Sequence, residues 1–450
     1  MKKREKSITE GPIFVNLFLF TVPIILTGLL QLLYNAADVI VVGRFAGSNS
    51  LAAVGSTSSL THLFLNIFIG LSSGSAVCVA HFIGAKEKEG VKRAVHTSIG
   101  IAAIGGVFVA VVGYIFSKNF LAMMDTPADI IDEAALYLKI IFIGMPASLI
   151  YNFGAAILRA KGNTKTPLLI LSATGVVNVI LNLVFVIVFK MGAEGVGIAT
   201  IVSQFLSAVM IVKYLMKLED ECKLELKKIR IYKNILIRIL KIGLPAGIQG
   251  IIFSVSNILI QSSINGFGSA TVAGNSASSN IESFSYVAMN AMHQAVTTYV
   301  GQNVGANKIE RVKKIIVTAC VQVTIIGVVL SGVLLLFAHP LLNLYVPGDE
   351  EVIALGALRM KYILSTYFIC GIMDTLVGAL RGMGTSFLPM LASVFGVCVL
   401  RVVWIFTVFP KYQTLHSIYI SYPISWLITT LIQAVLTAIV VRSLAKNIIE

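Results

Sequence analysis

The stretch NFGAAILRAKGNTKTPLL (152–169) recurs 222 residues later in the chain as DTLVGALRGMGTSFLPML (374–391). Three further pairs match at offsets of 220 to 222: TVPIILTGLLQLLYN (21–35) with GLPAGIQGIIFSVSN (243–257), VGSTSS (54–59) with GNSASS (274–279), and HFIGAKEKEGVKR (81–93) with QNVGANKIERVKK (302–314). Self-similarity at a constant offset is typical of an internally duplicated fold. The sequence therefore predicts two halves that share one architecture.

Both halves are strongly apolar. Hydrophobic residues make up 57% of the 450 residues, charged residues only 12%, and the mean hydropathy is +0.89. A soluble domain has about 25% charged residues. Twelve apolar runs reach the length that crosses a bilayer as a helix, and they are continuous rather than alternating, which argues against a membrane β-barrel. The predicted spans are 13–43, 50–82, 93–117, 131–158, 166–189, 194–217, 236–265, 271–302, 312–338, 351–380, 386–410 and 415–442.

The charged segment KYLMKLEDECKLELKKIRIYK (213–233) separates the first six spans from the last six. We therefore expect an all-α polytopic membrane protein with an N-terminal bundle (1–217), a cytoplasmic linker (218–234) and a C-terminal bundle (235–450). Because each half has an even number of spans, the two repeats have the same orientation and are related by an axis along the membrane normal. Such a pair of six-helix bundles suits a central cavity that opens alternately to each side.

The net charge of +14 follows the expected topology. If the basic N-terminus is cytoplasmic, 27 of the 35 Lys and Arg residues fall in cytoplasmic segments. This is the positive-inside pattern, and it predicts a multi-pass protein of the cell membrane with both termini in the cytoplasm. The basic charge thus reflects topology, and we expect no nucleic-acid partner. The first apolar run is too long for a cleaved signal peptide and is expected to be retained.

Motifs of enzymes and metal sites are missing from the sequence. The five cysteines contain no CxxC pair, and no nucleotide-binding G-x-x-x-x-G-K, G-x-S-x-G or H-x-x-x-H pattern occurs. We therefore expect neither an enzyme nor a bound cofactor, apart from a coupling ion.

One carboxylate, Asp38, lies inside the first apolar run. Gln31, Asn35 and Asp38 are spaced i, i+4 and i+7 and share a helix face, which predicts a polar stripe toward a bundle or a watery cavity. Ionisable residues at this depth are functional candidates. In a largely dry pocket, lost hydration favours the neutral acid, which suits a proton carrier. The alternative is a structural carboxylate paired with a donor.

Three polar residues of the fifth and sixth spans are candidates to surround Asp38. Asn178 and Asn182 are spaced i, i+4, and Thr200 lies early in the sixth span. Their oxygens suit a sodium site at Asp38 and Asn178, or a hydrogen-bond network that holds the carboxylate. Alternatively, the asparagines link neighbouring helices, as polar residues do in membrane bundles.

The C-terminal half has its own polar set. Glu282, Tyr286, Met289, Asn290 and His293 follow one another at helical spacing in the eighth span, and Asp374 lies in the tenth. The acids could attract a cationic substrate, and the aromatic and methionine side chains could pack it. The alternative is that one acid pairs with Arg401, which lies deep in the eleventh span.

Taken together, the chain resembles the multidrug and toxic compound extrusion (MATE) family. The resemblance rests on NAADVIVVGRFAG (35–47), GAAILRAKGNT (154–164), NVILNLVF (178–185) and VGQNVGANKIERV (300–312), in this order on a six-plus-six repeat. It implies a V-shaped pair of six-helix bundles that exports organic cations in exchange for protons or sodium.

The resemblance is strongest to the prokaryotic branch related to DNA-damage-inducible protein F, in which the first-span aspartate is the coupling site. Asp38, Asn178 and Thr200 match that site, and Asp374 matches an aspartate of the tenth span. Some members have a second acid where this chain has Asn182. The missing charge weakens a sodium site, so protons are favoured over sodium.

We expect the protein to act as a monomer surrounded by membrane lipid. Two other functions compete with multidrug efflux. A lipid-linked oligosaccharide or lipid-precursor flippase would need a cavity rich in Lys and Arg, yet only Arg401 lies deep in a span. A membrane-embedded enzyme would need a convergent catalytic set, and the sequence shows none. We therefore expect small-molecule organic cations as substrates.

Overall fold

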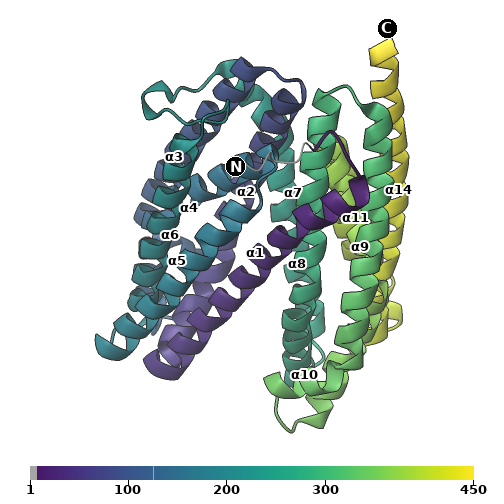
Figure 1. Ribbon diagram of the computed structural model, residues 1–450. Coiled ribbons are helices and arrows are strands. Elements are labelled where there is room, and N and C mark those ends of the chain that lie inside the picture. The colour runs from purple at the N-terminus through teal and green to yellow at the C-terminus, as the bar shows by residue number, and fades with distance from the viewer. Residues whose placement is uncertain (1–7, 125, 450) are drawn as a thin grey trace. The chain divides into compact units, whose positions relative to one another are not determined.

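The computed structural model describes residues 8–124 and 126–449, and the described chain is built from helices (Figure 1). The N-terminal half contains α1 (Ile13–Val41), α2 (Ser48–Gly84), α3 (Lys88–Met123), α4 (Ile131–Lys161), α5 (Lys165–Leu183) and α6 (Ala193–Lys217). The C-terminal half contains α7 (Lys233–Asn265), α8 (Ser269–Gly305), α9 (Ile309–Leu336), α10 (Ala338–Tyr345), α11 (Glu350–Gly382), α12 (Phe387–Ser393), α13 (Leu400–Thr407) and α14 (Leu415–Ile449).

Every predicted span falls on a helix. Within the described residues, eleven helical segments are long and apolar enough to cross a membrane. The twelfth, α8, has 37 residues but is not among the eleven, because polar side chains such as Asn275 and Glu282 lower its hydropathy. The predicted span 386–410 is α12 and α13 joined by a π-helical turn, Val394–Val399. The short α10 was not predicted.

The chain forms two compact units whose boundaries fall inside α1 and α7. Unit 1 contains residues 26–247, and unit 2 contains residues 8–25 and 248–449. The sequence instead predicted a division at the linker, 218–234. The difference arises because the first half of α1 packs in the C-terminal unit, whereas the first half of α7 packs in the N-terminal unit. Pro23 and Pro245 lie near these two boundaries.

Glycines bring the first half of α7 against α2 in unit 1. A Cβ atom on Gly70 would lie 2.3 Å from the backbone nitrogen of Gly247, and one on Gly74 would lie 2.5 Å from the carbonyl oxygen of Ile239. Gly243 completes the crossing, because its Cβ would lie 2.6 Å from the Cα atom of Leu71. Small residues four apart allow membrane helices to approach this closely.

The first half of α1 is held in unit 2 by its side chains and by its backbone. Leu17, Phe20 and Ile24 are buried in the core of that unit, and the Phe20 ring packs edge-on against Tyr299 with 5.2 Å between centroids. Gln322 of α9 donates to the carbonyl oxygen of Phe14 at 2.6 Å.

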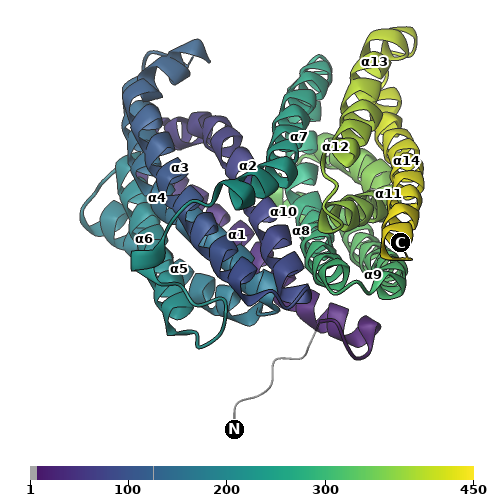
Figure 2. The ribbon, with the colours of Figure 1, turned by 90° about the horizontal axis from the view of Figure 1, so that it is seen from above.

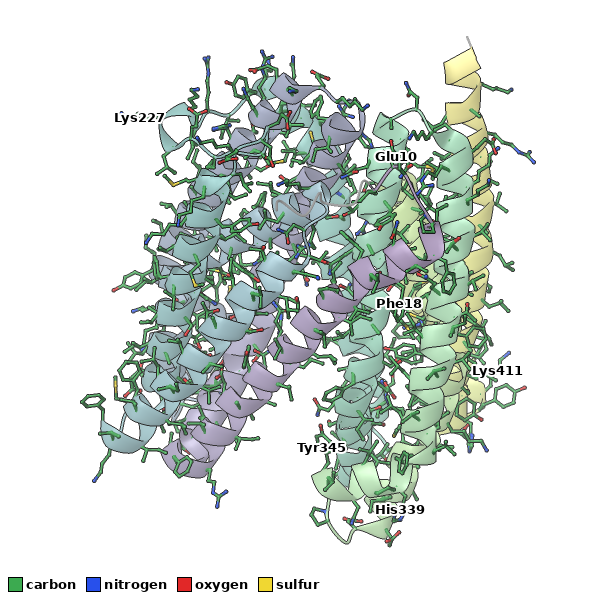
Figure 3. The ribbon with its side chains drawn as sticks, in the orientation of Figure 1. Glu10, Phe18, Lys227, His339, Tyr345 and Lys411 are labelled. Atoms are coloured by element: carbon green, nitrogen blue, oxygen red, sulfur yellow. The ribbon has the colours of Figure 1, made fainter. Side chains whose placement is uncertain are left out.

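The residues just before α1 are anchored on the start of α9. Arg311 donates to the carbonyl oxygens of Glu10 and Gly11 at 3.0 and 2.9 Å, and Lys308 donates to that of Thr9 at 3.0 Å. Glu10 and Phe18 mark this N-terminal segment in Figure 3. The segment therefore belongs to unit 2 through several independent contacts.

The internal repeat extends to unusual backbone conformations. Gly47 and Gly268 precede α2 and α8 with φ values of 95° and 97°, and Gly162 and Gly384 follow α4 and α11 with φ values of 108° and 86°. Gly47 and Gly268 lie 221 residues apart, and Gly162 and Gly384 lie 222 residues apart, as in the sequence repeat. Glycine adopts positive φ without the steric penalty that a Cβ atom brings, so the repeat preserves the turns as well as the spans.

The linker is docked on unit 1. The backbone N–H of Glu225 donates to Nε2 of His96 at 3.1 Å, and that of Tyr232 donates to Oγ1 of Thr97 at 3.2 Å. Lys161 at the end of α4 pairs with Asp220 at 2.6 Å. These contacts gather the basic segments of unit 1 that the sequence places in the cytoplasm.

Candidate functional site

Asp38 is placed by the contact between the second half of α1 and α5, which lie side by side in unit 1 (Figure 1). One turn before Asp38, Tyr34 lies over Gly175, where a Cβ atom would fall 1.9 Å from the tyrosine ring. The Tyr34 hydroxyl donates to the carbonyl oxygen of Ser172 at 3.3 Å. Glycine at position 175 thus allows the close approach that brings Asp38 to α5.

At the site, a single amide group links the carboxylate to a second amide. Asn182 donates from Nδ2 to Oδ1 of Asp38, and it also donates over 3.3 Å to Oδ1 of Asn178. Asn182 is fully buried, Asn178 is buried and Asp38 is half-buried. In the part of the chain that the structure describes, no basic side chain forms an ion pair with Asp38. The charge is therefore satisfied by a neutral donor.

Thr200 lies on α6, a helix that packs against α5 in unit 1. An apolar cluster closes one end of the site, and its buried members are Val41, Val42, Val54, Val186, Ala193 and Val196. Val42 lies one turn after Asp38, Val186 one turn after Asn182, and Val196 one turn before Thr200. The cluster therefore joins the chain segments that follow Asp38 and Asn182 and the segment that precedes Thr200. The Thr200 hydroxyl and the Oδ1 atom of Asn182 are buried without a hydrogen-bond partner among the described residues.

Both helices that carry the hydrogen-bonded pair change to π-helical turns just beyond it. These turns are Val42–Ala46 after α1 and Val184–Val188 after α5. π-Helical turns within longer helices are frequent at functional sites, and these two turns also supply valines of the apolar cluster.

Not all of the predicted stripe of α1 is involved. Gln31 and Asn35 are exposed, and within the described residues they form no hydrogen bond. Of the three residues of the stripe, only Asp38 is hydrogen-bonded to α5 in the part of the chain that the structure describes. Tyr137 of α4 is an addition that sequence reasoning missed, since it packs against the apolar cluster next to the site. A tyrosine within an apolar span carries no sequence signal that would have indicated this role.

In unit 2, Glu282 is paired with an arginine. Arg359 of α11 donates from Nε and Nη2 to the two carboxylate oxygens of Glu282 at 3.1 and 2.9 Å, and from Nη1 to Oδ1 of Asn275 at 2.7 Å. Glu282 and Arg359 are 4% and 8% exposed. A two-point pair of this kind neutralises both charges, so Glu282 has the surroundings of a structural carboxylate.

Arg401 is not the partner of either acid. Its guanidinium lies 4.0 Å from the centre of the Tyr422 ring and 5.5 Å from that of Trp426, and its Nε atom donates to Ser425 at 2.8 Å. Aromatic faces attract cations by their quadrupole, more strongly when the cation is desolvated. Aromatic rings of α14 therefore stabilise this buried charge.

A second polar group of unit 2 contains Asp374 and His293. Nδ1 of His293 lies 2.7 Å from the backbone oxygen of Asp374, and Nε2 lies 3.2 Å from Nη1 of Arg381. A carbonyl oxygen only accepts and a guanidinium only donates, so His293 is the neutral tautomer with its proton on Nδ1. Arg381 also donates to Gln249 of α7 at 2.8 Å. His293 is thus fully engaged in holding α8, α11 and α7 together.

The remaining predicted residues of α8 lie on two different faces. Tyr286 is 41% exposed, and Asp374 of α11 is half-buried. Met289 is fully buried, and it packs in the core, where Gly327 and Gly371 leave space for it. Asp374 and Tyr286 therefore remain the predicted residues of this half that a substrate could contact.

Comparison with known proteins agrees with this architecture. A polytopic helical protein with a half-buried carboxylate, Asp38, inside a membrane-spanning helix has the features of a membrane transporter. The MatE family model matches residues 23–184 and again residues 245–407, once in each half of the chain. The chain therefore belongs to the MatE family; it is a transporter and not an enzyme.

Relatives and solved structures extend the match over nearly the whole chain. The chain is 28% identical to the probable multidrug resistance protein YoeA of Bacillus subtilis, over 94% of this chain and 93% of that protein. It is 26% identical to the probable multidrug resistance protein NorM of Thermotoga maritima, over 85% and 83% of the two chains. The outward-facing structure of a multidrug resistance MATE family transporter of the MOP superfamily superimposes with a TM-score of 0.92, over 99% of this chain and 100% of that chain, at 21% identity. The predicted all-helical polytopic fold is thereby confirmed.

Proposed function

We propose that this protein is a secondary active multidrug exporter that exchanges amphipathic organic cations for protons by alternating access. The observation that carries the proposal is the half-buried Asp38, which has no cationic partner among the described residues and accepts a hydrogen bond from Asn182. Such a carboxylate can gain and lose a proton without breaking an ion pair. Protonation changes the interaction of the Asp38 carboxylate with α5. A bound ion shifts a conformational equilibrium only if its affinity differs between the two conformations, and this interaction can provide that difference.

Proton coupling fits the arrangement better than sodium coupling. A hard cation requires oxygen ligands, whereas the group between Asp38 and Asn178 is the NH₂ of Asn182. A proton on Asp38 would turn the carboxylate into a donor. The buried Oδ1 atom of Asn182 lacks a partner among the described residues, and it would accept a hydrogen bond from the protonated carboxyl group once the amide group rotates.

The proposed substrates are small organic cations, in line with the names of the relatives, which are multidrug resistance proteins. Asp374 supplies a half-buried carboxylate in unit 2, and Tyr286 of the same unit supplies an exposed aromatic ring. Aromatic rings attract organic cations. We also propose that the chain belongs to the branch related to DNA-damage-inducible protein F and that both termini are cytoplasmic. The halves 1–217 and 235–450 would supply the two transport bundles, apart from residues 8–25 and 235–247, which pack in the unit of the other half.

A flippase for pyrophosphate-linked lipids is not favoured. Such a protein needs basic side chains that are free to bind phosphate. Glu282 neutralises Arg359, and aromatic rings pack on Arg401.

The test is transport of a fluorescent organic cation by purified protein in proteoliposomes, with proton and sodium gradients imposed separately. A proton gradient alone should drive transport, and Asp38→Asn should reduce it to the level of protein-free vesicles. Asp132→Asn is the matched control. This exposed carboxylate lies away from the site, and its Oδ1 atom is 2.6 Å from Nζ of Lys118. Transport driven by sodium alone, or normal transport by the Asp38 variant, would contradict the proposal.

A second variant tests why this chain does not use sodium. Asn182→Asp replaces the amide donor beside Asp38 by a second carboxylate, and two adjacent carboxylates attract a cation. Sodium should stimulate transport by this variant and leave the native protein unchanged. If neither protein responds to sodium, the amide is not what excludes the ion.

A further inference from the structure

Unit 2 contains an apolar groove that the proposed transport cycle does not use. It has a volume of about 760 Å³, with walls from residues 313–325 of α9 and 430–442 of α14 and with Ile372 and Leu376 of α11 at its floor. Figure 2 shows α9, α11 and α14 next to one another at the end from which the molecule is viewed. Each wall extends over twelve helical steps, or about 18 Å. One leaflet of a bilayer has a hydrocarbon depth of about 15 Å, so the groove has the length of one acyl chain.

The threonine hydroxyl groups that line this groove are already hydrogen-bonded within their helices. Thr324, Thr430 and Thr437 each donate at 2.7 Å to the carbonyl oxygen four residues earlier in the same helix. Their hydroxyls are therefore turned toward the helix backbone and not toward the groove. Val317, Val321 and Ile325 form an exposed apolar wall on α9, with exposures of 64%, 47% and 51%. The groove thus offers dispersion contacts along its length and few polar contacts.

One end of the groove is strongly basic. Lys313 of α9 and Arg442 of α14 line this end from opposite walls. Lys314 and Lys446, both exposed, lie next to Lys313 and one turn beyond Arg442. Glu310, an acid at this end, lies 2.6 Å from Lys313 in an exposed pair with side chains 81% and 47% accessible. Exposed pairs of this kind are weak, so the local charge stays positive.

We propose that this groove binds an anionic phospholipid, with an acyl chain between α9 and α14 and the phosphate at Lys313 and Arg442. Basic groups between membrane helices attract anionic head groups, and the apolar walls match the tail. An organic cation would be repelled by the same two side chains, which separates this site from substrate binding. The lipid would come from the leaflet at the basic ends, which the charge distribution predicts to be the cytoplasmic one.

The location suggests what the lipid does. Lys308 and Arg311, five and two residues before Lys313, donate to the carbonyl oxygens of residues 9–11. A lipid that bridges α9 and α14 at this end would therefore stabilise the helix on which the N-terminal segment is anchored. A ligand that binds only the folded state raises thermal stability with its concentration.

The experiment measures lipid binding to the purified full-length chain in a neutral detergent. Dioleoyl phosphatidylglycerol, dioleoyl phosphatidylcholine and glycerol 3-phosphate are titrated separately, with native mass spectrometry and the thermal unfolding midpoint as readouts. We expect phosphatidylglycerol to bind and to raise the midpoint, phosphatidylcholine to bind weakly, and glycerol 3-phosphate to do neither. Equal binding of the two lipids, or binding of glycerol 3-phosphate alone, would overturn the proposal.

Two variants divide the site into its head-group and tail parts. Lys313→Gln with Arg442→Gln should weaken phosphatidylglycerol binding by about 25-fold, because each basic residue near anionic lipid contributes about fivefold. The control variant combines Lys92→Gln with Lys165→Gln, which removes the same number of positive charges. Both lysines are exposed and belong to unit 1. This control should leave binding unchanged.

Val321→Trp fills the groove and keeps every charge. It should also reduce phosphatidylglycerol binding. If the double Gln variant binds as the native chain does, or if Val321→Trp has no effect, this groove is not the lipid site. None of these measurements depends on transport, so their outcome is independent of the proposed antiport function.

Discussion

Asp38 and Glu282 are carboxylates within membrane helices, and their surroundings differ. Asp38 accepts from the neutral amide of Asn182, whereas both oxygens of Glu282 are held by Arg359. A carboxylate held by an arginine is committed to its ionised form, and one held by an amide can exchange a proton. The two acids of similar sequence context therefore suit different roles, coupling for Asp38 and structure for Glu282.

This difference can be measured at the residue scale. Removal of one member of a buried ion pair leaves an unpaired buried charge and typically destabilises a protein by about 3–5 kcal/mol. Arg359→Met and Glu282→Gln should therefore lower the thermal unfolding midpoint of the purified protein, and the double variant should be less destabilised than Arg359→Met. A Glu282→Gln protein of native stability that has lost binding of an organic cation would instead indicate a substrate role.

Sequence reasoning at this scale found the carboxylate of unit 1 and its amide neighbours. Asp38 and Asn182 could be selected because polar residues are rare in apolar spans. The i, i+4 spacing of Asn178 and Asn182 also indicates that these two residues share a helix face. Arg359 could not be assigned to Glu282, because the pair joins residues 77 positions apart on two helices. His293 was selected for its chemistry, yet both of its ring nitrogens are used within the fold.

At the scale of helices, the crossing of α2 and α7 depends on the absence of side chains. Gly70 and Gly74 of α2 face Gly243 and Gly247 of α7, with gaps too small for a Cβ atom. In lipid, helices associate by close packing and not by exclusion of water. This glycine contact therefore holds the first half of α7 in unit 1.

A single methyl group should disrupt this crossing. Gly70→Ala would place a Cβ atom 2.3 Å from the backbone of Gly247, and overpacking of this kind typically costs about 1–3 kcal/mol. Gly55→Ala in the same helix is the control, because nothing lies within 4 Å of its added Cβ atom. The thermal unfolding midpoint should fall for the first variant and stay equal or rise for the second. Equal midpoints would show that the two helices can separate without loss of stability.

At the scale of the whole molecule, α1 and α7 each contribute to both units. Residues 8–25 supply Leu17, Phe20 and Ile24 to the core of unit 2, and residues 233–247 pack in unit 1. A cut in the linker would therefore divide the sequence repeat but not the two structural units.

Separate expression of residues 1–227 and 228–450 tests this arrangement. Each fragment alone lacks part of its unit and should be degraded or fail to unfold cooperatively. When the fragments are expressed together they should copurify, because residues 8–25 of the first fragment pack in unit 2. A stable, cooperatively unfolding fragment 228–450 on its own would contradict the assignment of residues 8–25 to that unit.

The sequence by itself determined the helical membrane fold, its spans, its internal repeat and the candidate Asp38. These features depend on composition, on the length of apolar runs and on spacing along one helix, all of which are local in the chain. The tertiary structure decided which acid is neutralised, where α1 and α7 change units, and that a basic-ended groove forms between α9 and α14. Each of these depends on side chains from distant helices meeting, and one-dimensional spacing does not determine which helix faces meet.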